Sequence, residues 1–365
     1  FCAEARKYGI GIVLDGVFNH CGSFNKWMDR EQIYENQEGY EPGAYVSADS
    51  PYRSFFKFNN DQAWPYNPNY DGWWGHDTLP KLCYEQSPKL HDYILEIGKK
   101  WVSPPFNVDG WRLDVAADLG FSNEYNHQFW KDFRKAVKAA NPNAIILAEH
   151  YGNPEGWLKG DEWDTVMNYP FYLNLIDLLA DEKITVSQFV QNLGYLKGRL
   201  HKNCYPLMWN LIDSHDTARF LHLCDDNKKK QHLAAAFQLL LPGMPMIYYG
   251  DEFAMPGAND PDCRRGMYWD EEYQDKDMFE WYKQLLKVRK NHACIVEGEP
   301  LEIAARDGEE TIVLTRKNDE ETLALIFNCS SSARVFHEYA QKYDLLREKP
   351  FDGKIEGLEA AVIVL

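Results

Sequence analysis

Short apolar runs recur along the chain, and each of them ends in polar or charged residues. Six such runs are read as strands: 9–20, 106–116, 143–152, 163–171, 206–216 and 242–252. Between them lie segments such as 124–141 and 228–243, and the first of these places its apolar residues three or four apart before an Asn-Pro stop. Strands that alternate with amphipathic helices predict parallel βα units with both sheet faces covered.

The position of the polar residues favours one parallel fold over another. All six predicted strands carry them at the carboxyl end, where an α/β barrel gathers its active site. A doubly wound sheet uses the loops at one switch point instead, and no G-x-G-x-x-G follows any strand. We therefore expect a (β/α)8 TIM barrel.

Two regions depart from this alternation. Residues 21–90 are rich in Pro, Gly, Asn and aromatic residues, and they are read as a subdomain inserted in the barrel. From about residue 296, β-forming residues alternate with polar ones between turn signals, which predicts a C-terminal antiparallel β domain. The expected domains are therefore a catalytic barrel over 1–295, with the insertion at about 21–90, and the β domain over 296–365.

Composition narrows the class of partner. Aromatic residues make up 15% of the 365 residues, which fits either a large aromatic core or flat platforms for sugar rings. The net charge of −17 argues against a nucleic-acid partner, and no apolar run is long enough to span a membrane. The eight cysteines form no C-x-x-C pair, which indicates no zinc site or disulfide framework and favours a cytoplasmic protein over a secreted one.

Three acids stand at the ends of different predicted strands: Asp114, Glu149 and Asp216. Arg112 lies two residues before Asp114, hence on the same face of its strand, and would keep that carboxylate ionised. Polar residues at a barrel rim are common, so each acid alone has an ordinary structural explanation. Together they match glycoside cleavage, which needs one ionised and one protonated carboxyl group. Soft-metal and phosphoryl chemistry are disfavoured, since metal-type Cys/His clusters and a phosphate loop are absent from the sequence.

Five motifs, in order, carry a resemblance to a known family. They are "DGVFNH" (15–20), "GWRLDVA" (110–116), "LAEHYG" (147–152), "LIDSHDTARF" (211–220) and "GMPMIYYGDE" (243–252). The sequence resembles the α-amylase family of glycoside hydrolases, family thirteen, and is most similar to its neopullulanase, cyclomaltodextrinase and maltogenic amylase branch. The segments "GWWGHDTLPKL" (72–82) and "NDPDCRRGMYW" (259–269) are similar to segments of that branch.

The resemblance implies a role for each acid. Asp114 would be the nucleophile, Glu149 the general acid/base, and Asp216 a carboxylate that stabilises the transition state. The reaction would be a retaining double displacement on α-1,4 bonds, and also α-1,6 bonds, of cyclodextrins, pullulan, starch or maltooligosaccharides, with transglycosylation as a side reaction. The substrate-binding candidates are His20, Arg112, His215, Asp118, His150 and Trp74, and the supporting candidates are Asp15 and Asn19.

The resemblance also bears on cofactors and assembly. No cofactor is required, and a structural calcium ion would be held by oxygen ligands, with Asn19 as one candidate and the full set unassigned. The branch dimerises through an N-terminal domain, so a homodimer is implied. In the family's barrel the run 9–20 is the third strand. The first two strands and the N-terminal domain are therefore expected to be missing here, and this chain alone is expected to fold poorly or to be inactive.

Two departures from the branch and three rival functions stay open. Cys83 stands where the branch usually has Asn, and Asp118 where it commonly has Glu, which leaves chain-length preference undetermined. The rivals are an exo-acting α-glucosidase or related transferase, a non-catalytic transporter-associated relative, and a starch-binding module. The retained acids argue against the last two.

Overall fold

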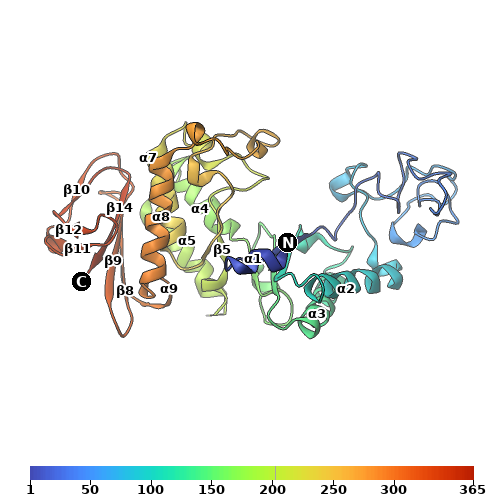
Figure 1. The fold of residues 1–365 in the computed structure, drawn as a ribbon, viewed down its shortest axis with the longest axis horizontal. Coiled ribbons are helices and arrows are strands. Elements are labelled where there is room, and N and C mark those ends of the chain that lie inside the picture. Colours follow the sequence, from blue (N-terminus) through green and yellow to red (C-terminus); the bar gives the residue numbers. More distant parts are fainter. Residues whose placement is uncertain (202) are drawn as a thin grey trace. The chain divides into compact units, whose positions relative to one another are not determined.

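The structure is a computed structural model that describes residues 1–201 and 203–365 (Figure 1). Its chain divides into two compact units, Phe1–Val166 and Met167–Leu365. The first unit contains a parallel sheet with two long helices. In the second unit, the described residues form six helices, a short parallel strand pair and an antiparallel sheet near the C-terminus.

The sheet of the first unit has the order β1-β2-β3-β4, and its paired strands are parallel. Its strands are β1 (Val13–Gly16), β2 (Gly110–Leu113), β3 (Ile145–Ala148) and β4 (Thr165–Val166). The register aligns Asp15 with Arg112, and Leu113 with Ala148. The residues that follow β2 and β3 therefore leave the sheet at the same edge.

Two long helices pack against one another in this unit. They are α2 (Pro88–Val102) and α3 (Asn123–Ala140), and a short helix α1 (Cys2–Lys7) precedes β1. The hydroxyl of Ser122 accepts the N–H of Tyr125 at 3.2 Å and caps α3. The buried residues of α3 are Asn126, Phe129, Trp130, Phe133 and Val137. The stripe predicted from the sequence is therefore the buried face of this helix.

The inserted segment 21–90 is built from turns and short 3-10 helices before α2 begins at its end. The 3-10 helices are Arg53–Phe55, Trp73–Gly75 and Tyr84–Gln86. Isolated antiparallel bridges join His20 to Lys81 and Phe56 to Leu82. These bridges hold the segment around residues 72–82 beside the chain that leaves β1.

The second unit starts with alternating helices and a short parallel pair. Its helices are α4 (Tyr169–Leu179), α5 (Val186–Arg199), α6 (Phe220–Leu223), α7 (Lys228–Leu240), α8 (Lys276–Asn291) and α9 (Cys294–Glu297). The parallel pair is β5 (Trp209–Asn210) and β6 (Met244–Pro245). All four long helices bury apolar residues in one cluster with the strands that follow. Helix α7 is the most deeply buried of them, and nine of its thirteen residues are buried.

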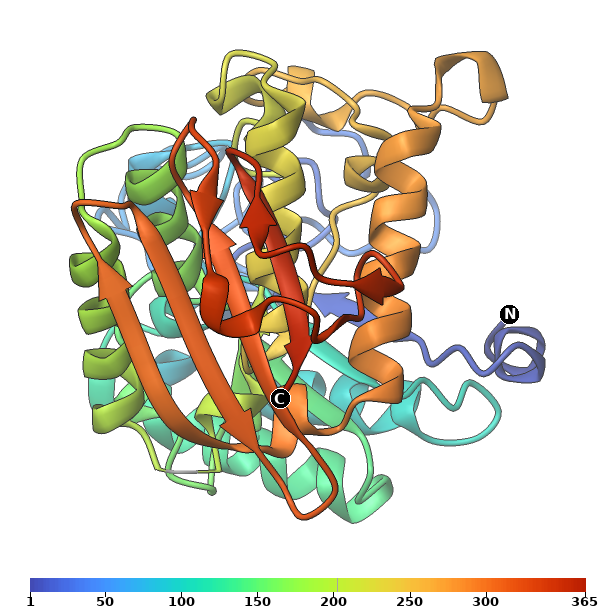
Figure 2. The same ribbon diagram turned by 90° about the vertical axis from the view of Figure 1, so that its left-hand side faces the viewer.

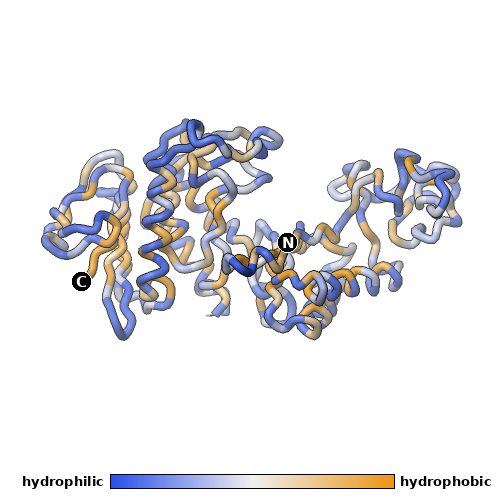
Figure 3. Tube along the Cα trace, viewed as in Figure 1, coloured by the Kyte–Doolittle hydropathy of each residue, from blue (hydrophilic) through white to orange (hydrophobic). Residues whose placement is uncertain are grey.

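The C-terminal sheet is antiparallel and has the order β12-β11-β14-β9-β8-β7. Its strands are β7 (Glu299–Arg306), β8 (Thr311–Lys317), β9 (Thr322–Asn328), β11 (Tyr343–Asp344), β12 (Lys349–Pro350) and β14 (Glu359–Val364), and β10 (Arg334–Val335) pairs with β13 (Lys354–Ile355). Figure 2 shows this sheet in front of the helices, where α7 contacts β14 and α5 contacts β7. Its central strands are apolar (Figure 3) and form a core between sheet and helices.

The predicted alternation agrees with the structure, with shorter elements. Each of the six apolar runs contains one strand, and the strands are only two to four residues long. The C-terminal antiparallel sheet is confirmed, whereas the domain boundary at 295/296 stays a prediction. Within the described residues, no helix combines the length and apolarity needed to cross a bilayer, and the eight cysteines are unpaired.

Candidate active site

One guanidinium lies between three carboxylates at the edge of the parallel sheet. Arg112 Nη1 donates to Asp15 Oδ1 at 2.9 Å and to Asp114 Oδ1 at 2.8 Å. Its Nη2 lies 3.1 Å from Glu149 Oε2. The sequence predicts Arg112 beside Asp114, and the structure adds the other two acids. The parallel register of β1, β2 and β3 brings all three carboxylates within reach of one planar fork.

Burial strengthens this arrangement. The exposed fractions of the side chains are 3% for Glu149, 11% for Arg112 and 18% for Asp114, while Asp15 is 53% exposed. Burial lowers the pKa of Arg112, but the carboxylates of Glu149 and Asp15 outweigh it and raise that pKa above its ordinary value. The guanidinium therefore stays charged and keeps two buried carboxyl groups close together.

The backbone between the two acids is unusual. Val115 has φ 36° and ψ 48°, a left-handed conformation that is unfavourable for a β-branched residue. Its N–H donates to Glu149 Oε2 at 2.8 Å, and Ala116 N–H donates to the Glu149 carbonyl at 3.3 Å. The strained turn after Asp114 is thus joined directly to Glu149, which fixes the two acids relative to one another.

The buried side-chain amide of Asn126, on α3, is hydrogen-bonded to the same turn. Asn126 Nδ2 lies within hydrogen-bonding distance of three carbonyls, those of Ala116 at 3.0 Å, Ala117 at 3.2 Å and Leu119 at 2.9 Å. Its Oδ1 accepts the indole N–H of Trp157 at 2.8 Å. Trp157 lies in the segment that follows Glu149, so Asn126 connects the loops that carry both acids.

An aromatic stack leads from His20 into the inserted segment. The His20 ring lies parallel to Trp73 with centroids 5.0 Å apart, and Trp73 stacks on Trp74 at 4.8 Å. Trp74 is 78% exposed, as a platform for a ligand would be. Burial lowers the pKa of His20, although the nearby charge of Asp114 acts in the opposite direction. His20 is therefore a neutral ring near Asp114.

Asp118 ends the short 3-10 turn after Asp114, and His150 directly follows Glu149. Asp118 Oδ2 accepts the Trp73 indole N–H at 2.8 Å, and Lys81 Nζ donates to the Asp118 carbonyl at 2.9 Å. The ring of His150 lies against Trp157 at 5.1 Å, and burial lowers its pKa while the charge of Asp118 raises it. His150 is thus packed among tryptophan rings, which also gives it a structural role.

The third predicted acid lies in the second unit, in the loop after β5. Asp216 Oδ2 lies 3.2 Å from His215 Nε2, and Asp216 Oδ1 lies 3.1 Å from Arg264 Nη2. Arg264 Nε also donates to the His215 carbonyl at 2.9 Å. Arg264 therefore contacts both predicted residues of this loop and supplies the positive charge beside Asp216.

Sequence reasoning missed two residues that hold the predicted acids. Arg264 belongs to the segment 259–269, which carried the resemblance without an assigned role. Its signal was the run of charges in "DPDCRR". Asn126 gave no signal beyond a polar residue on the buried stripe of a predicted helix. A polar residue on the buried face of a helix indicates that nearby backbone groups need it as a hydrogen-bond partner.

Asn19 was a candidate ligand for calcium. The residue is fully buried, and its Oδ1 is a buried oxygen with no hydrogen-bond partner. Calcium requires six to eight oxygen ligands. Among the residues that the structure describes, no group of three or more His, Cys, Asp or Glu side chains could hold a metal ion. Calcium also accepts backbone and amide carbonyl oxygens, so a structural calcium ion at Asn19 stays a prediction.

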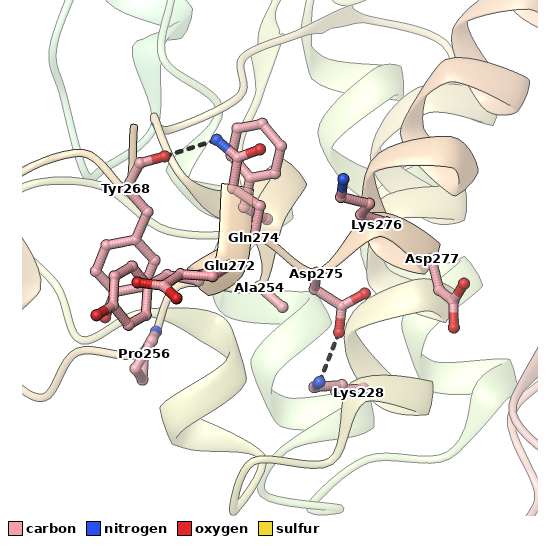
Figure 4. Close-up of a pocket in the computed structure, with 11 residues that line it drawn as sticks. Lys228, Ala254, Pro256, Tyr268, Glu272, Gln274, Asp275, Lys276 and Asp277 are labelled. Carbon is pink, nitrogen blue, oxygen red and sulfur yellow. Dashed lines mark hydrogen bonds and ion pairs between the residues drawn. The ribbon is translucent and has the colours of Figure 1, made fainter. Parts of the chain in front are cut away.

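The structure also has hollows beside these groups. In the first unit, residues 117–124 line a hollow of about 390 Å³ directly after Asp114. In the second unit, a hollow of about 490 Å³ lies between residues 253–256 and the start of α8 (Figure 4). Lys228 pairs with Asp275 there, and none of the lining residues is a predicted site residue. The hollow after Asp114 contains the predicted site residue Asp118 in its lining.

These features define an α/β protein whose parallel strands end in buried, ion-paired carboxylates, and comparison with known proteins gives its family. Residues 1–274 match the family model described as alpha amylase, catalytic domain. The chain belongs to the alpha-amylase family, as its motifs predicted. Enzymes of this family need no organic cofactor.

Individual relatives support the same branch. The chain is 38% identical over 333 residues to a cyclomaltodextrinase of Geobacillus thermopakistaniensis, covering 90% of this chain and 53% of the relative. It is 37% identical over 295 residues to neopullulanase 2 of Thermoactinomyces vulgaris, covering 81% and 47%. The ligand-free cyclic α-maltosyl-(1→6)-maltose hydrolase of Arthrobacter globiformis matches with a TM-score of 0.83 and 29% identity, over 100% of this chain and 77% of that structure.

These matches also allow the length of the chain to be compared with that of its relatives. It spans about half the length of the curated relatives it matches. The comparisons confirm part of the predicted fold. The chain contains an alpha-amylase catalytic domain, which resembles TIM-barrel enzymes, and an antiparallel sheet follows it.

Proposed function

We propose that the natural protein containing this chain is a retaining glycoside hydrolase that cleaves α-glucosidic bonds in cyclodextrins, pullulan, starch or maltooligosaccharides. The observation that supports the proposal most directly is the contact of one buried guanidinium with both Asp114 and Glu149. A retaining glycosidase needs two carboxyl groups close together, one as nucleophile and one as acid/base.

The roles of the residues follow from the two steps of that reaction. Asp114 attacks the anomeric carbon while Glu149 protonates the leaving glycosidic oxygen, and a covalent glycosyl-enzyme forms. Glu149 then takes a proton from water, which displaces Asp114. An acceptor sugar in place of water gives transglycosylation. Asp216 would stabilise the positive charge that develops on the sugar ring, and His20, His215 and Arg112 would bind that ring.

The local geometry supports these roles for the first two acids. The side chain of Glu149 is 3% exposed, so bulk water has little access to the proton that it must deliver. Asp114 is held at one oxygen by Arg112 at 2.8 Å, which orients the carboxylate. The assignment of Asp216 rests on its motif and on its contacts with His215 and Arg264.

The proposal is tested on the natural full-length protein. Cyclodextrin, pullulan and soluble starch are incubated with it and with the Asp114→Asn variant, and products are separated by chromatography. Release of maltose or panose by the wild type, with at least a thousandfold loss in the variant, about the effect of removing a nucleophile, supports the proposal. A folded protein that releases nothing overturns it in favour of a non-catalytic carbohydrate-binding relative.

The same product analysis separates the alternative within the family. An exo-acting α-glucosidase releases glucose from chain ends and leaves cyclodextrins intact, because a ring has no end. Ring opening therefore distinguishes the two enzymes. A calcium requirement, a homodimer and a cytoplasmic location stay predictions. They are checked by activity after chelation, by sedimentation of the full-length protein and by fractionation of cells.

A further inference from the structure

A second pair of carboxyl groups is buried in the other unit, away from solvent. Asp213 and Asp251 are each 1% exposed, and their carboxyl groups lie close enough for a hydrogen bond between them. Two carboxyl groups can share such a bond only when one of them carries a proton. Asp213 lies just after β5 and Asp251 follows β6, so the bond joins two loops at neighbouring strand ends.

The remaining contacts leave one oxygen of each carboxyl group for that proton. Asp213 Oδ2 accepts the backbone N–H of Phe220 at 2.7 Å, and Asp251 Oδ1 accepts Arg219 Nη1 at 3.0 Å. Asp213 Oδ1 and Asp251 Oδ2 receive no hydrogen bond from an N–H or O–H group of the described residues. A single proton between these two oxygens gives every oxygen of the pair a partner. Burial raises the pKa of both groups, and the charge of Asp213 raises that of Asp251 further.

Other polar groups face the pair from each element packed against it. Arg219 is fully buried, and its guanidinium lies 4.3 Å from the centre of the Tyr248 ring. The other groups that face the pair are Glu252 beside Asp251, Tyr282 from α8, Gln231 from α7 and Tyr172 from α4. Arg219 is the one cation that acts on the pair among the residues described, so a second ionised carboxylate would be left uncompensated.

The pair closes the loop that carries the third predicted acid. The bond from Phe220 to Asp213 joins the two ends of the segment 213–220, and Asp216 lies in its middle. Arg219 N–H also donates to the Gly257 carbonyl at 3.0 Å. Within the loop, Asp216 N–H donates to Ser214 Oγ at 3.2 Å. The conformation of the loop is therefore fixed from its buried ends.

We propose that Asp213, Asp251 and Arg219 form a buried, proton-sharing clamp that positions Asp216 and His215 for the reaction proposed above. These three are positioning residues, since their contacts are with the loop and with one another. The inference rests on the proposed function for its effect on catalysis. The shared proton also has an effect on stability that is measured without any substrate.

The sign of that effect follows from linkage. A carboxyl group whose pKa is raised in the folded protein stabilises the fold most at acid pH. That stability is lost as the pH rises from about 4, where the unfolded group loses its proton, towards the folded pKa. Asparagine at position 251 keeps the acceptor for Arg219 and the donor for Asp213, and it does not titrate. The stability of the Asp251→Asn variant should therefore fall less with rising pH than that of the wild type.

The test compares Asp251→Asn, Asp251→Ala and the exposed Asp319→Asn in the natural full-length protein. We expect Asp251→Ala to lower kcat at least about tenfold with a smaller change in KM, and Asp251→Asn to restore kcat to within about threefold. The melting temperature, measured from about pH 5 to pH 9, should fall less steeply with pH in Asp251→Asn than in the wild type and Asp319→Asn.

Three results would overturn the proposal. An Asp251→Asn variant as slow as Asp251→Ala would show that the clamp does not act through the shared hydrogen bond. An unchanged pH dependence of its melting temperature would show that no proton is shared. A wild type that cleaves no glucan removes the reaction and with it the positioning role, and the melting curves then report on the carboxyl pair alone.

Discussion

The indole N–H of Trp73 donates to Asp118 Oδ2 at 2.8 Å, which ties the inserted segment to the turn that follows Asp114. Trp73→Phe keeps a ring to stack on His20 and Trp74 and removes the donor. A net hydrogen bond to a charged group is worth about 1.5–3 kcal/mol, so we expect KM for maltooligosaccharides to rise at least about tenfold.

A double-mutant cycle isolates this bond. If Trp73 acts through Asp118, Trp73→Phe should cost almost nothing more in an Asp118→Ala background. Fully additive effects of the two substitutions would show that the two residues contribute independently, and the bond would then have no role in substrate binding.

Replacement of Arg112 by lysine tests the three-carboxylate contact. Lysine keeps the charge but presents one compact ammonium group in place of a planar fork, so it cannot reach Asp15, Asp114 and Glu149 together. We expect kcat to fall at least about a hundredfold, about 2.7 kcal/mol in the barrier, as the acids lose their relative orientation. Steady-state kinetics of Arg112→Lys measure this.

A matched control is available in the same unit. Arg134 pairs with Asp164 at 2.6 Å and donates to the Glu162 carbonyl, and neither partner is a predicted site residue. Arg134→Lys should lower the melting temperature slightly and leave kcat within about twofold of wild type. An equal loss of activity in both variants would mean that any ion-paired arginine of this unit matters, and the special role of Arg112 would be rejected.

The histidine beside Asp114 gives a prediction for acid pH. Burial lowers the pKa of His20 below that of the unfolded chain, which is about 6.5. Below that pH, His20 binds a proton more readily in the unfolded chain than in the folded protein. The free energy of unfolding should therefore fall as the pH drops below about 6.5, by at most about 1.4 kcal/mol per pH unit for one group.

Urea denaturation at a series of pH values measures this fall in wild type and in His20→Gln, which should show a smaller one. His337 is exposed and provides the control, since His337→Gln should keep the wild-type pH dependence. Identical curves for wild type and His20→Gln would contradict the prediction.

The buried amide of Asn126 should be essential to the turn after Asp114. Asn126→Leu removes the donor for three carbonyls and the acceptor for Trp157, which leaves buried polar groups unpaired. We expect a loss of about 2–4 kcal/mol in the free energy of unfolding, at the upper end for a single hydrogen-bonding group. In protein that remains folded, kcat should fall more than KM changes.

Denaturation and steady-state kinetics of Asn126→Leu, beside the exposed Asn143→Leu, test both parts. A variant that is destabilised but retains wild-type kcat would show that Asn126 supports the fold without positioning the acids.

The sequence predicted contacts within one strand better than contacts between strands. Arg112 and Asp114 are two residues apart, so the geometry of a strand puts them on one face. The contact of Arg112 with Glu149 depends on how β2 and β3 align side by side, which no local pattern encodes. The alternation of apolar strand segments with amphipathic helix segments likewise predicted the parallel sheet. Burial of the strands and of one face of each helix leaves a pattern that the sequence itself shows.

Contacts made by irregular segments could not be predicted from the sequence. Arg264 contacts Asp216 across 48 residues of chain, through a loop whose path depends on packing. Asp213 and Asp251 lie in motifs that the resemblance had already noted, yet their pairing depends on the neighbouring ends of β5 and β6. Such pairs become visible only when the chain is folded.

The left-handed valine next to Asp114 has a consequence for protein engineering. A β-branched residue at φ 36° is held there by its surroundings at a cost of roughly 1–2 kcal/mol, which Val115→Gly would relieve. Glycine would also loosen the turn whose amide reaches Glu149. Selection for heat tolerance and selection for turnover should therefore act in opposite directions at position 115. Libraries sorted by survival at high temperature would collect glycine there, and libraries sorted by product release would retain valine.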